Sequence, residues 1–432
     1  MKCIIFGVGG REAIIAKELA KEHELYAYIS HGNATILECA AKTGGKYIID
    51  KEYDLTRIKK FLVEEKIEFC VVNSDGLLEK GVIDVAKECG LITFGPTRVG
   101  ARIEWDKAYA LEVIRKIAPD SLVRTETISD LDRLSEVIKG YDGVDFVIKP
   151  NGLTGGKGVK VGGEHFKTKE EGLEYATKCL KEDGCVILQD KMVGHEFSLM
   201  GFTNGRDLVL APCTYDYPYR FDGDKGPGTG GMGVVTFNNG LLPFLNESDL
   251  EKCKDIMKKT LDEINKDSLE FNGVLYGGFF KTAKGIYFME FNSRLGDPEA
   301  LNILMLMETP FALTALTIAN EEALNKYNCS FKKQASYVVY VVSREYAVNS
   351  KAEPIKFLLP EELTENEGFY CANMEKADGE TYVSVGNSRL FALAASGEDL
   401  MEIKKSVDEV LEKYIGGSNK LDYRTDIGVE GL

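Results

Sequence analysis

The stretches NGLTGGKGV at residues 151–159 and EFNSRLGDPE at residues 290–299 decide how this 432-residue chain is interpreted. The first follows an apolar run and contains four glycines, which let backbone N–H groups approach a phosphate because no side chain intervenes. The second ends a predicted strand, and Glu290 and Asn292 are two residues apart, so their side chains share one face. We expect both stretches to meet at one triphosphate.

The first stretch does not fit the P-loop pattern. Lys157 is followed by Gly158 instead of Ser or Thr, and no helix begins there. We interpret the stretch as a flexible lid over a triphosphate, with point charges from Lys149 and Lys157. An ordinary hairpin turn is the alternative. The lid interpretation assigns phosphate contacts to the backbone of Gly152, Gly155, Gly156 and Gly158.

The second stretch offers oxygen ligands and a cation. A carboxylate from Glu290 and an amide oxygen from Asn292 suit Mg²⁺ or Mn²⁺ shared with phosphates. Arg294 is placed to neutralise charge on a transferring phosphoryl group. Asp297 either orients a substrate amine or caps the helix that follows Pro298, and both interpretations stay open. Taken alone, Glu290 also fits a solvated acid at a strand end.

A second glycine-rich turn joins the first predicted strand to the first helix. Gly9, Gly10, Arg11 and Glu12 follow that strand, and N–H groups at a helix N-terminus suit an anion. A purely structural turn is the alternative, and the dinucleotide pattern fails because Glu12 replaces its third glycine. Asp75, after the fourth predicted strand, either accepts hydrogen bonds from ribose hydroxyls or is a solvated loop acid.

Composition limits the class of protein. Apolar residues make up 44% and charged residues 28% of the chain, which is usual for globular proteins. The formal net charge of −16 argues against nucleic-acid or anionic-membrane partners. Ten cysteines occur without a Cys-x-x-Cys pair, which disfavours zinc and favours free thiols in a reducing compartment. The sequence contains no run of 18 apolar residues, so we expect no membrane span. We expect a cytoplasmic protein of two to four domains.

Hydrophobic patterning predicts an α/β protein. Short β-branched runs alternate with amphipathic segments over residues 1–95, which indicates a parallel sheet covered by helices. Helix and turn are expected over 105–135, a Gly/Pro-rich loop over 222–233 and one helix over 298–320. The predicted N-terminal strands are 3–6, 25–29, 46–49, 69–72 and 91–94; the helices are 11–22, 54–65 and 78–89; later strands are 146–149, 158–161, 186–189, 273–281, 285–291, 334–343, 381–386 and 389–395.

These motifs resemble the ATP-grasp superfamily and, within it, the glycinamide ribonucleotide synthetase family. The resemblance runs nearly end to end and is carried by residues 9–12, 32–34, 94–97, 226–233 and 290–299. It implies an N-terminal α/β domain that binds phosphoribosylamine (1–104), an ATP-grasp core (105–325) with a lid subdomain over about 122–195, and a small α+β C-terminal domain (326–432).

The resemblance also implies residue roles. Lys107 and Lys149 would hold ATP phosphates, and Glu196 would take the ATP ribose. Asp216 joins Arg294 and Asp297 as a candidate catalytic residue. The adenine hinge would be Gln189, Asp190, Lys191 and Met192, and further substrate contacts would come from Gly32, Asn33, Thr229, Gly230, Gly231 and Met232.

The implied reaction joins glycine to 5-phosphoribosylamine through an acyl phosphate, with ATP and Mg²⁺ or Mn²⁺, and yields glycinamide ribonucleotide, ADP and phosphate. The chain departs from the family pattern at Val8, Ala13, 74–77, 215–219 and Gln189. A divergent ligase for another amino acid or amine is therefore one alternative, and a non-catalytic nucleotide-binding protein is another. Partners are expected to be small molecules, and the protein a monomer or dimer.

Overall fold

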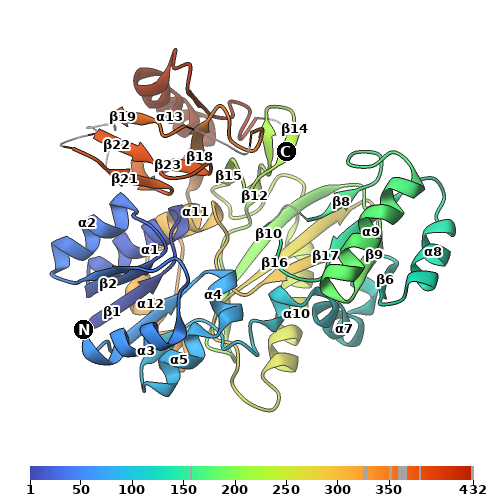
Figure 1. The fold of residues 1–432 in the computed structure, drawn as a ribbon, viewed down its shortest axis with the longest axis horizontal. Helices are drawn as coiled ribbons and strands as arrows, with labels where there is room; N and C mark the ends of the chain where they lie inside the picture. The colour runs from blue at the N-terminus through green and yellow to red at the C-terminus, as the bar shows by residue number, and fades with distance from the viewer. Residues whose placement is uncertain (156–157, 325–328, 350–352, 359–366, 379–380, 430–432) are drawn as a thin grey trace.

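The computed structural model describes residues 1–155, 158–324, 329–349, 353–358, 367–378 and 381–429. Three groups of sheets surround a central region (Figure 1). The N-terminal sheet lies at lower left and the C-terminal sheets at the top; the sheet formed within residues 125–190, here named the lid sheet after the predicted lid subdomain, lies at right. None of the helices within the described ranges is both long and apolar enough to cross a membrane.

The N-terminal sheet confirms the predicted parallel arrangement. Its strand order is β3-β2-β1-β4-β5, and every neighbouring pair is parallel. Because the strands are parallel, the turns after β1, β2 and β4 lie along the same edge of the sheet. The strands are β1 (Lys2–Phe6), β2 (Glu24–Ile29), β3 (Tyr47–Ile49), β4 (Phe69–Val72) and β5 (Ile92–Phe94).

Helices cover both faces of this sheet. One face packs on α1 (Gly10–Ala20), α2 (Ala34–Thr43), α11 (Glu299–Leu306) and α12 (Phe311–Ala319). The other packs on α3 (Leu55–Glu64), α4 (Asp75–Lys80) and α5 (Val82–Glu88). The predicted helix 78–89 is wrong as one unit, since Gly81 adopts φ 87° and separates α4 from α5. The predicted helix 298–320 is divided likewise, with Pro310 directly before α12.

The lid sheet has the order β6-β9-β7-β8, with antiparallel pairs. It follows α6 (Arg102–Trp105), α7 (Lys107–Ile117) and the 3₁₀ turn Pro119–Ser121. Two helices, α8 (Leu131–Lys139) and α9 (Lys169–Asp183), bury their apolar faces on it. The strands are β6 (Thr125–Ile128), β7 (Phe146–Pro150), β8 (Lys160–Val161) and β9 (Val186–Asp190).

The central sheet has the order β11-β10-β16-β17 and is antiparallel. Helix α10 (Glu247–Ile264) packs on the face that holds the second core of the molecule. Its strands are β10 (His195–Thr203), β11 (Leu208–Leu210), β16 (Gly273–Thr282) and β17 (Gly285–Asn292).

The C-terminal sheet combines strands from two parts of the chain. The order is β12-β15-β18-β23-β20, with β24 also paired to β18, and α13 (Leu400–Ile415) covers it. The predicted loop 222–233 is partly wrong, because a hairpin of β13 and β14 enters it. The strands are β12 (Tyr215–Asp216), β13 (Tyr219–Phe221), β14 (Lys225–Gly228), β15 (Gly233–Thr236), β18 (Ala335–Ser343), β20 (Glu367–Cys371), β23 (Arg389–Gly397) and β24 (Leu421–Asp422); β19 (Lys356–Leu358), β22 (Thr381–Ser384) and β21 (Met374–Lys376) form a separate small sheet.

Candidate active site

A cavity of about 770 Å³ lies where the lid sheet, the central sheet, the N-terminal turns and the β13–β14 hairpin meet. Half of the residues predicted from the sequence line it, although they come from segments up to about 290 positions apart. These are Arg11, Asp75, Lys107, Lys149, Gly155, Gln189, Glu196, Asp216, Thr229, Gly230, Glu290, Asn292, Arg294 and Asp297.

A β-bulge brings the candidate metal ligands into this cavity. The pairing of β16 with β17 shifts by one residue between Gly278 and Phe279. Before the shift, Ile286 and Phe288 pack in the core of the central sheet; beyond it, Phe291 does so. Glu290 and Asn292 have the same parity as Phe288, so without the extra residue they would face the core.

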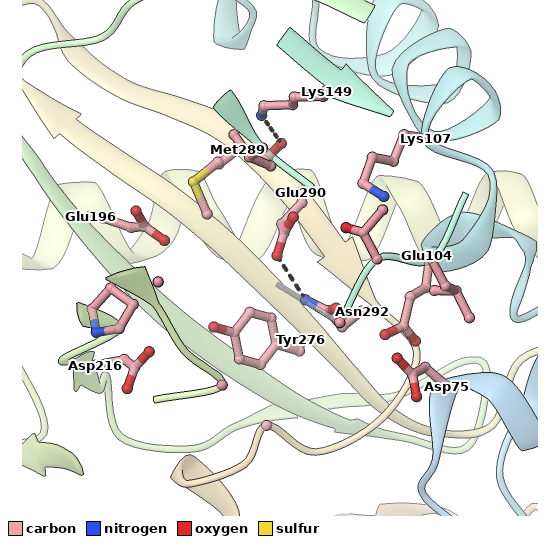
Figure 2. A pocket seen from close by; sticks show the side chains of 18 of the residues that line it. Asp75, Glu104, Lys107, Lys149, Glu196, Asp216, Tyr276, Met289, Glu290 and Asn292 are labelled. Atoms are coloured by element: carbon pink, nitrogen blue, oxygen red, sulfur yellow. Dashed lines mark hydrogen bonds between the residues drawn. The ribbon is translucent and has the colours of Figure 1, made fainter. Parts of the chain in front are cut away.

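Polar contacts connect these two side chains to a buried ion pair, and Figure 2 shows the hydrogen bond between Glu290 and Asn292. Asn292 Nδ2 donates to Glu290 Oε1 at 3.4 Å, and Arg294 donates to Asn292 Oδ1 at 3.1 Å. Arg294 also pairs with Glu104 at 3.0 Å, and the backbone and hydroxyl of Ser293 donate to the same carboxylate. Burial raises the pKa of Glu104, while Arg294 opposes that shift. Glu104 thus holds Arg294 beside the candidate metal ligands.

The donor set tests the metal assignment. The described ranges contain no group of three or more His, Cys, Asp or Glu side chains suited to a metal ion. One carboxylate and one amide are nevertheless the oxygen donors that a hard divalent cation accepts when phosphates and water complete its coordination. Glu290 and Asn292 therefore fit a cation shared with a phosphorylated ligand.

The two lysines predicted to hold phosphates both line the cavity. Lys149, on β7, is buried, and its Nζ donates to the Met289 carbonyl at 3.3 Å. Burial lowers the pKa of Lys149, and the charges of Glu290 and Glu196 oppose this. Lys107 Nζ donates to the Gly152 carbonyl at 2.8 Å and so fixes the start of the predicted lid.

The glycines of the predicted lid differ in position. Gly155 lines the cavity, whereas Gly152 and Gly158 do not. The Gly158 carbonyl accepts a hydrogen bond from Tyr175 at 2.7 Å. Gly156 and Lys157 lie outside the described residues, so their predicted role as part of the lid stays a prediction.

The predicted hinge has one residue in the cavity wall. Gln189 is buried there and donates to Thr125 Oγ1 at 3.1 Å. Asp190, Lys191 and Met192 are not among the lining residues. Lys191 instead pairs with Glu164 at 2.9 Å, which ties the hinge to the turn after β8.

Acidic side chains gather on the part of the cavity wall formed by β10, β12 and α11. Burial, together with the charge of Glu290, raises the pKa of Glu196 to about 7. Burial raises the pKa of Asp216 well above its usual value, and the charges of Glu299 and Glu196 add to this. Asp216 Oδ1 is buried and has no hydrogen-bond partner among the described residues. Glu299 accepts from Tyr276 at 3.0 Å. This wall is suited to a ligand that carries a positive charge or hydrogen-bond donors.

Asp297 is held by residues from the C-terminal sheet. Tyr340 donates to its Oδ1 at 2.7 Å, and Arg389 pairs with its Oδ2 at 3.1 Å. The capping interpretation of Asp297 is wrong, because α11 begins at Glu299 with Pro298 as its N-cap and no side-chain cap. Sequence reasoning missed Tyr340 and Arg389, since both lie in strands without a local motif.

The N-terminal turn approaches the same corner. Arg11 lines the cavity, pairs with Glu12 at 2.7 Å and donates to the Leu295 carbonyl at 3.0 Å. Gly9 packs so closely that a Cβ there would lie 2.7 Å from the Glu12 carboxylate and 3.3 Å from Asp297. Gly9, Gly10 and Glu12 therefore lie directly behind the lining residues.

Asp75 lies near two of the three arginines that line the cavity. Burial alone would raise the pKa of Asp75, but the charges of Arg294 and Arg11 lower it below its usual value. The side chain is thus kept ionised beside two cations, which favours hydrogen bonding to ligand hydroxyls over the interpretation as a solvated loop acid.

Four predicted substrate residues contact protein and do not line the cavity. Asn33 caps α2 and donates to the carbonyls of Cys371 and Ala372, while the Gly32 N–H donates to Glu375. Met232 is buried against Val342 and Tyr346, and Gly231 packs on Asp216 and Pro298. Their predicted contacts with substrate remain predictions.

The fold and the site together define an ATP-grasp ligase. The family described as phosphoribosylglycinamide synthetase, N domain, matches residues 1–104, and the ATP-grasp (A) domain of the same family matches residues 105–300. The chain belongs to the phosphoribosylglycinamide synthetase family.

Individual relatives agree with this assignment. The phosphoribosylamine–glycine ligase of Methanothermobacter thermautotrophicus is 33% identical over 439 residues, covering 100% of this chain and 97% of the relative. That of Thermococcus kodakarensis is 33% identical, covering 99% and 96%. The crystal structure of the Thermotoga maritima ligase superimposes with a TM-score of 0.78 at 28% identity, covering 99% of this chain and 100% of that one. The biotin carboxylase domain of a Hydrogenobacter thermophilus 2-oxoglutarate carboxylase shares the fold (TM-score 0.70, 17% identity, covering 96% and 90%).

Proposed function

We propose that this chain catalyses the ATP-dependent joining of glycine to 5-phosphoribosylamine. One observation carries the proposal: Lys149 and Glu290, which we assign to the triphosphate, line the same cavity as Arg11, Asp75 and Asp297, which we assign to the acceptor. Ligation requires the nucleotide, the carboxylate and the amine to meet in one enclosed place. Relatives along the whole chain that are named phosphoribosylamine–glycine ligase support the same reaction.

Each residue's proposed role follows from its charge. Lys107 and Lys149 neutralise phosphate oxygens of ATP, with the glycine turn at 152–158 as lid, and Glu196 accepts from the ribose. Glu290 and Asn292 hold Mg²⁺ or Mn²⁺, which supplies charge neutralisation at the phosphates when bound. Arg294, fixed by Glu104, faces the phosphoryl group in transfer.

The chemistry has two steps. A glycine carboxylate oxygen attacks the γ-phosphorus of ATP, the bond to the β-phosphate oxygen breaks, and glycyl phosphate and ADP form. The amine of phosphoribosylamine then attacks the acyl carbon, phosphate leaves with the C–O bonding electrons, and the amine loses a proton. Asp216 and Asp297 orient the two amines, and the lid excludes water that would hydrolyse the acyl phosphate.

The organisation of the molecule is part of the same proposal. Units over 1–104, 105–325 and 326–432 supply the amine site, the nucleotide site and the residues that position Asp297. A cytoplasmic enzyme agrees with ten cysteines that are all free thiols.

Substrate omission tests the proposal. ADP release is measured with ATP, Mg²⁺, glycine and freshly generated phosphoribosylamine, and with each component left out in turn. We expect ADP and glycinamide ribonucleotide, identified by mass spectrometry, in equal amounts and only in the complete mixture. The proposal fails if phosphoribosylamine adds no ADP above background, or if alanine or serine replaces glycine with equal rate.

A further inference from the structure

Leu295 connects two residues to which the proposed function gives separate roles, Arg294 for the phosphoryl group and Asp297 for an amine. Its side chain is buried in the core between the N-terminal sheet and α11. A shift of the Leu295 backbone moves both neighbours, because only Gly296 separates Leu295 from Asp297. The way in which this backbone is held therefore affects both roles.

Two turns at the edge of the N-terminal sheet hold the backbone of Leu295. Its N–H donates to Oδ1 of Asn73, in the turn between β4 and α4, at 3.2 Å. Its carbonyl accepts from Nη1 of Arg11, in the first turn of α1, at 3.0 Å. The Arg294 guanidinium donates to the same carbonyl at 3.3 Å. Both peptide groups of Leu295 are thus fixed by side chains 222 and 284 positions away in the chain.

Asn73 uses only the accepting end of its side chain. The residue is buried, its Nδ2 has no hydrogen-bond partner among the described residues, and it is absent from the cavity lining. A buried donor without a partner is unfavourable, so a position needed only for packing would be better filled by an apolar side chain. The acceptor for the Leu295 N–H is what asparagine supplies here.

We propose that Asn73 is a positioning residue for phosphoryl transfer. By accepting the Leu295 N–H, its side chain fixes the backbone end of Arg294, while Glu104 holds the guanidinium end at 3.0 Å. A long side chain keeps one geometry only when both of its ends are held, because its torsions are otherwise free. The inference rests on the proposed function, which assigns Arg294 to the phosphoryl group in transfer.

Loss of the Asn73 contact slows the reaction without weakening nucleotide binding. Lys107 and Lys149, which we assign to the ATP phosphates, are held by other groups, the carbonyls of the lid turn and of β17. Arg294 acts on charge that develops in the transition state, so its displacement lowers kcat. A buried N–H left without an acceptor corresponds to a change of about 5- to 100-fold.

Steady-state kinetics of Asn73→Leu tests the proposal, because leucine has a similar shape and no acceptor. We expect kcat for ADP release with glycine and the amine to fall about 5- to 100-fold. The dissociation constant for ADP, measured by calorimetry with Mg²⁺, changes less than about 2-fold. Asn272→Leu is the matched control: Asn272 is buried, lies outside the cavity lining, and accepts from the Gly95 N–H, after β5, at 3.3 Å. The control lowers Tm and keeps kcat.

Asn73→Asp separates the acceptor from the rest of the side chain. It keeps an oxygen for the Leu295 N–H and removes only the unpartnered Nδ2. Arg11 and Arg294 supply positive charge to this region, where they lower the pKa of Asp75. We expect kcat of Asn73→Asp to stay closer to that of the unchanged protein than to that of Asn73→Leu. If the leucine variant does not fold, Asn73→Ala takes its place with the same expected results.

Three kinetic outcomes overturn the inference. The first is an unchanged kcat in Asn73→Leu, and the second is a loss of ADP affinity equal to the loss of kcat. The third is an equal kcat in Asn73→Leu and Asn73→Asp.

Amide hydrogen exchange over residues 290–299 gives a second readout that needs no substrate. Asn73→Leu raises the exchange rate in this stretch and Asn272→Leu does not. Equal exchange in the two variants overturns the inference whatever their activity. An unchanged protein that forms no glycinamide ribonucleotide refutes the proposed function, and the exchange comparison then decides on Asn73. A protein that ligates glycine with unaltered kcat in Asn73→Leu refutes the role of Asn73 alone.

Discussion

Replacing Glu196 by glutamine is expected to stabilise the protein at alkaline pH. The carboxyl lies in the cavity wall, where burial and the charge of Glu290 raise its pKa from 4.5 to about 7, and Lys149 only partly opposes them. In the unfolded chain the group ionises near 4.5, so between these two values the folded protein binds more protons. Stability therefore falls as pH rises from about 4.5 to about 7. Glutamine keeps the shape and removes the charge.

The magnitude follows from the size of the pKa shift. One pKa unit corresponds to about 1.36 kcal/mol, so the change from 4.5 to about 7 amounts to about 3.4 kcal/mol. Solvent inside the cavity reaches Glu196, and screening reduces the expected gain to about 1–2 kcal/mol. The gain is full above pH 8 and disappears as pH falls through 7 towards 4.5. Each kcal/mol raises Tm by about 2–4 °C in a domain of 150–250 residues.

Thermal unfolding in metal-free buffer with EDTA, measured from pH 4.5 to 8.5, tests the prediction. Glu196→Gln gives a Tm several degrees above the unchanged protein at pH 8.5 and an equal Tm at pH 4.5. Glu112→Gln, on the exposed side of α7, is the control and shifts Tm at neither pH. A Tm difference independent of pH, or a variant less stable at pH 8.5, refutes the assignment of Glu196 as an ionised group under electrostatic strain.

Three further substitutions test the site. Glu290→Ala removes a proposed metal ligand, so ADP release falls at least about 100-fold at any Mg²⁺ concentration; unchanged turnover removes the metal assignment. Tyr340→Phe deletes the 2.7 Å hydrogen bond to Asp297, and kcat/KM for the amine falls about 10- to 100-fold while ADP affinity is unchanged; an equal loss of ADP affinity contradicts this. Gly10→Ala places a Cβ 1.9 Å from the Tyr340 hydroxyl and reproduces the Tyr340→Phe defect with a lower Tm, whereas Gly76→Ala, whose Cβ meets nothing within 4 Å, does not.

The sequence predicts the N-terminal sheet well because its signals are local. Residues 69–72 form β4 with the predicted bounds, since a short β-branched run between turn residues needs no distant information. The helix limits fail where one residue interrupts an apolar period, as Gly81 does with its left-handed conformation. Strand β6 is an edge strand whose residues are mostly half-exposed, so its pattern is weak and the sequence interpretation missed it.

In the candidate site, too, residues of a local motif could be predicted and their distant partners could not. Glu290, Asn292 and Arg294 lie in one stretch, and their residue types and spacing are enough to indicate their chemistry. The partners of this stretch carry no such signal. Glu104, which pairs with Arg294, and Arg389, which pairs with Asp297, come from segments 190 residues before and 95 residues after Arg294. The β16–β17 bulge, which turns Glu290 towards the cavity, depends on pairing between strands and leaves no mark in the strand's own pattern.

The C-terminal sheet belongs to the active site and is more than a cover for it. Arg389 donates to the carbonyls of Gly230, Gly231 and Asp297, pairs with the Asp297 carboxylate, and stacks on Tyr340 at 4.3 Å. Breaking a buried ion pair by removing one partner costs about 3–5 kcal/mol, because the remaining charge stays unpaired. A chain that ended before β18 would leave the Asp297 carboxylate without its cation and the two glycine carbonyls without their hydrogen-bond donor. It would also expose the apolar face of β15. The C-terminal sheet is therefore required to hold Asp297 in its place in the cavity wall.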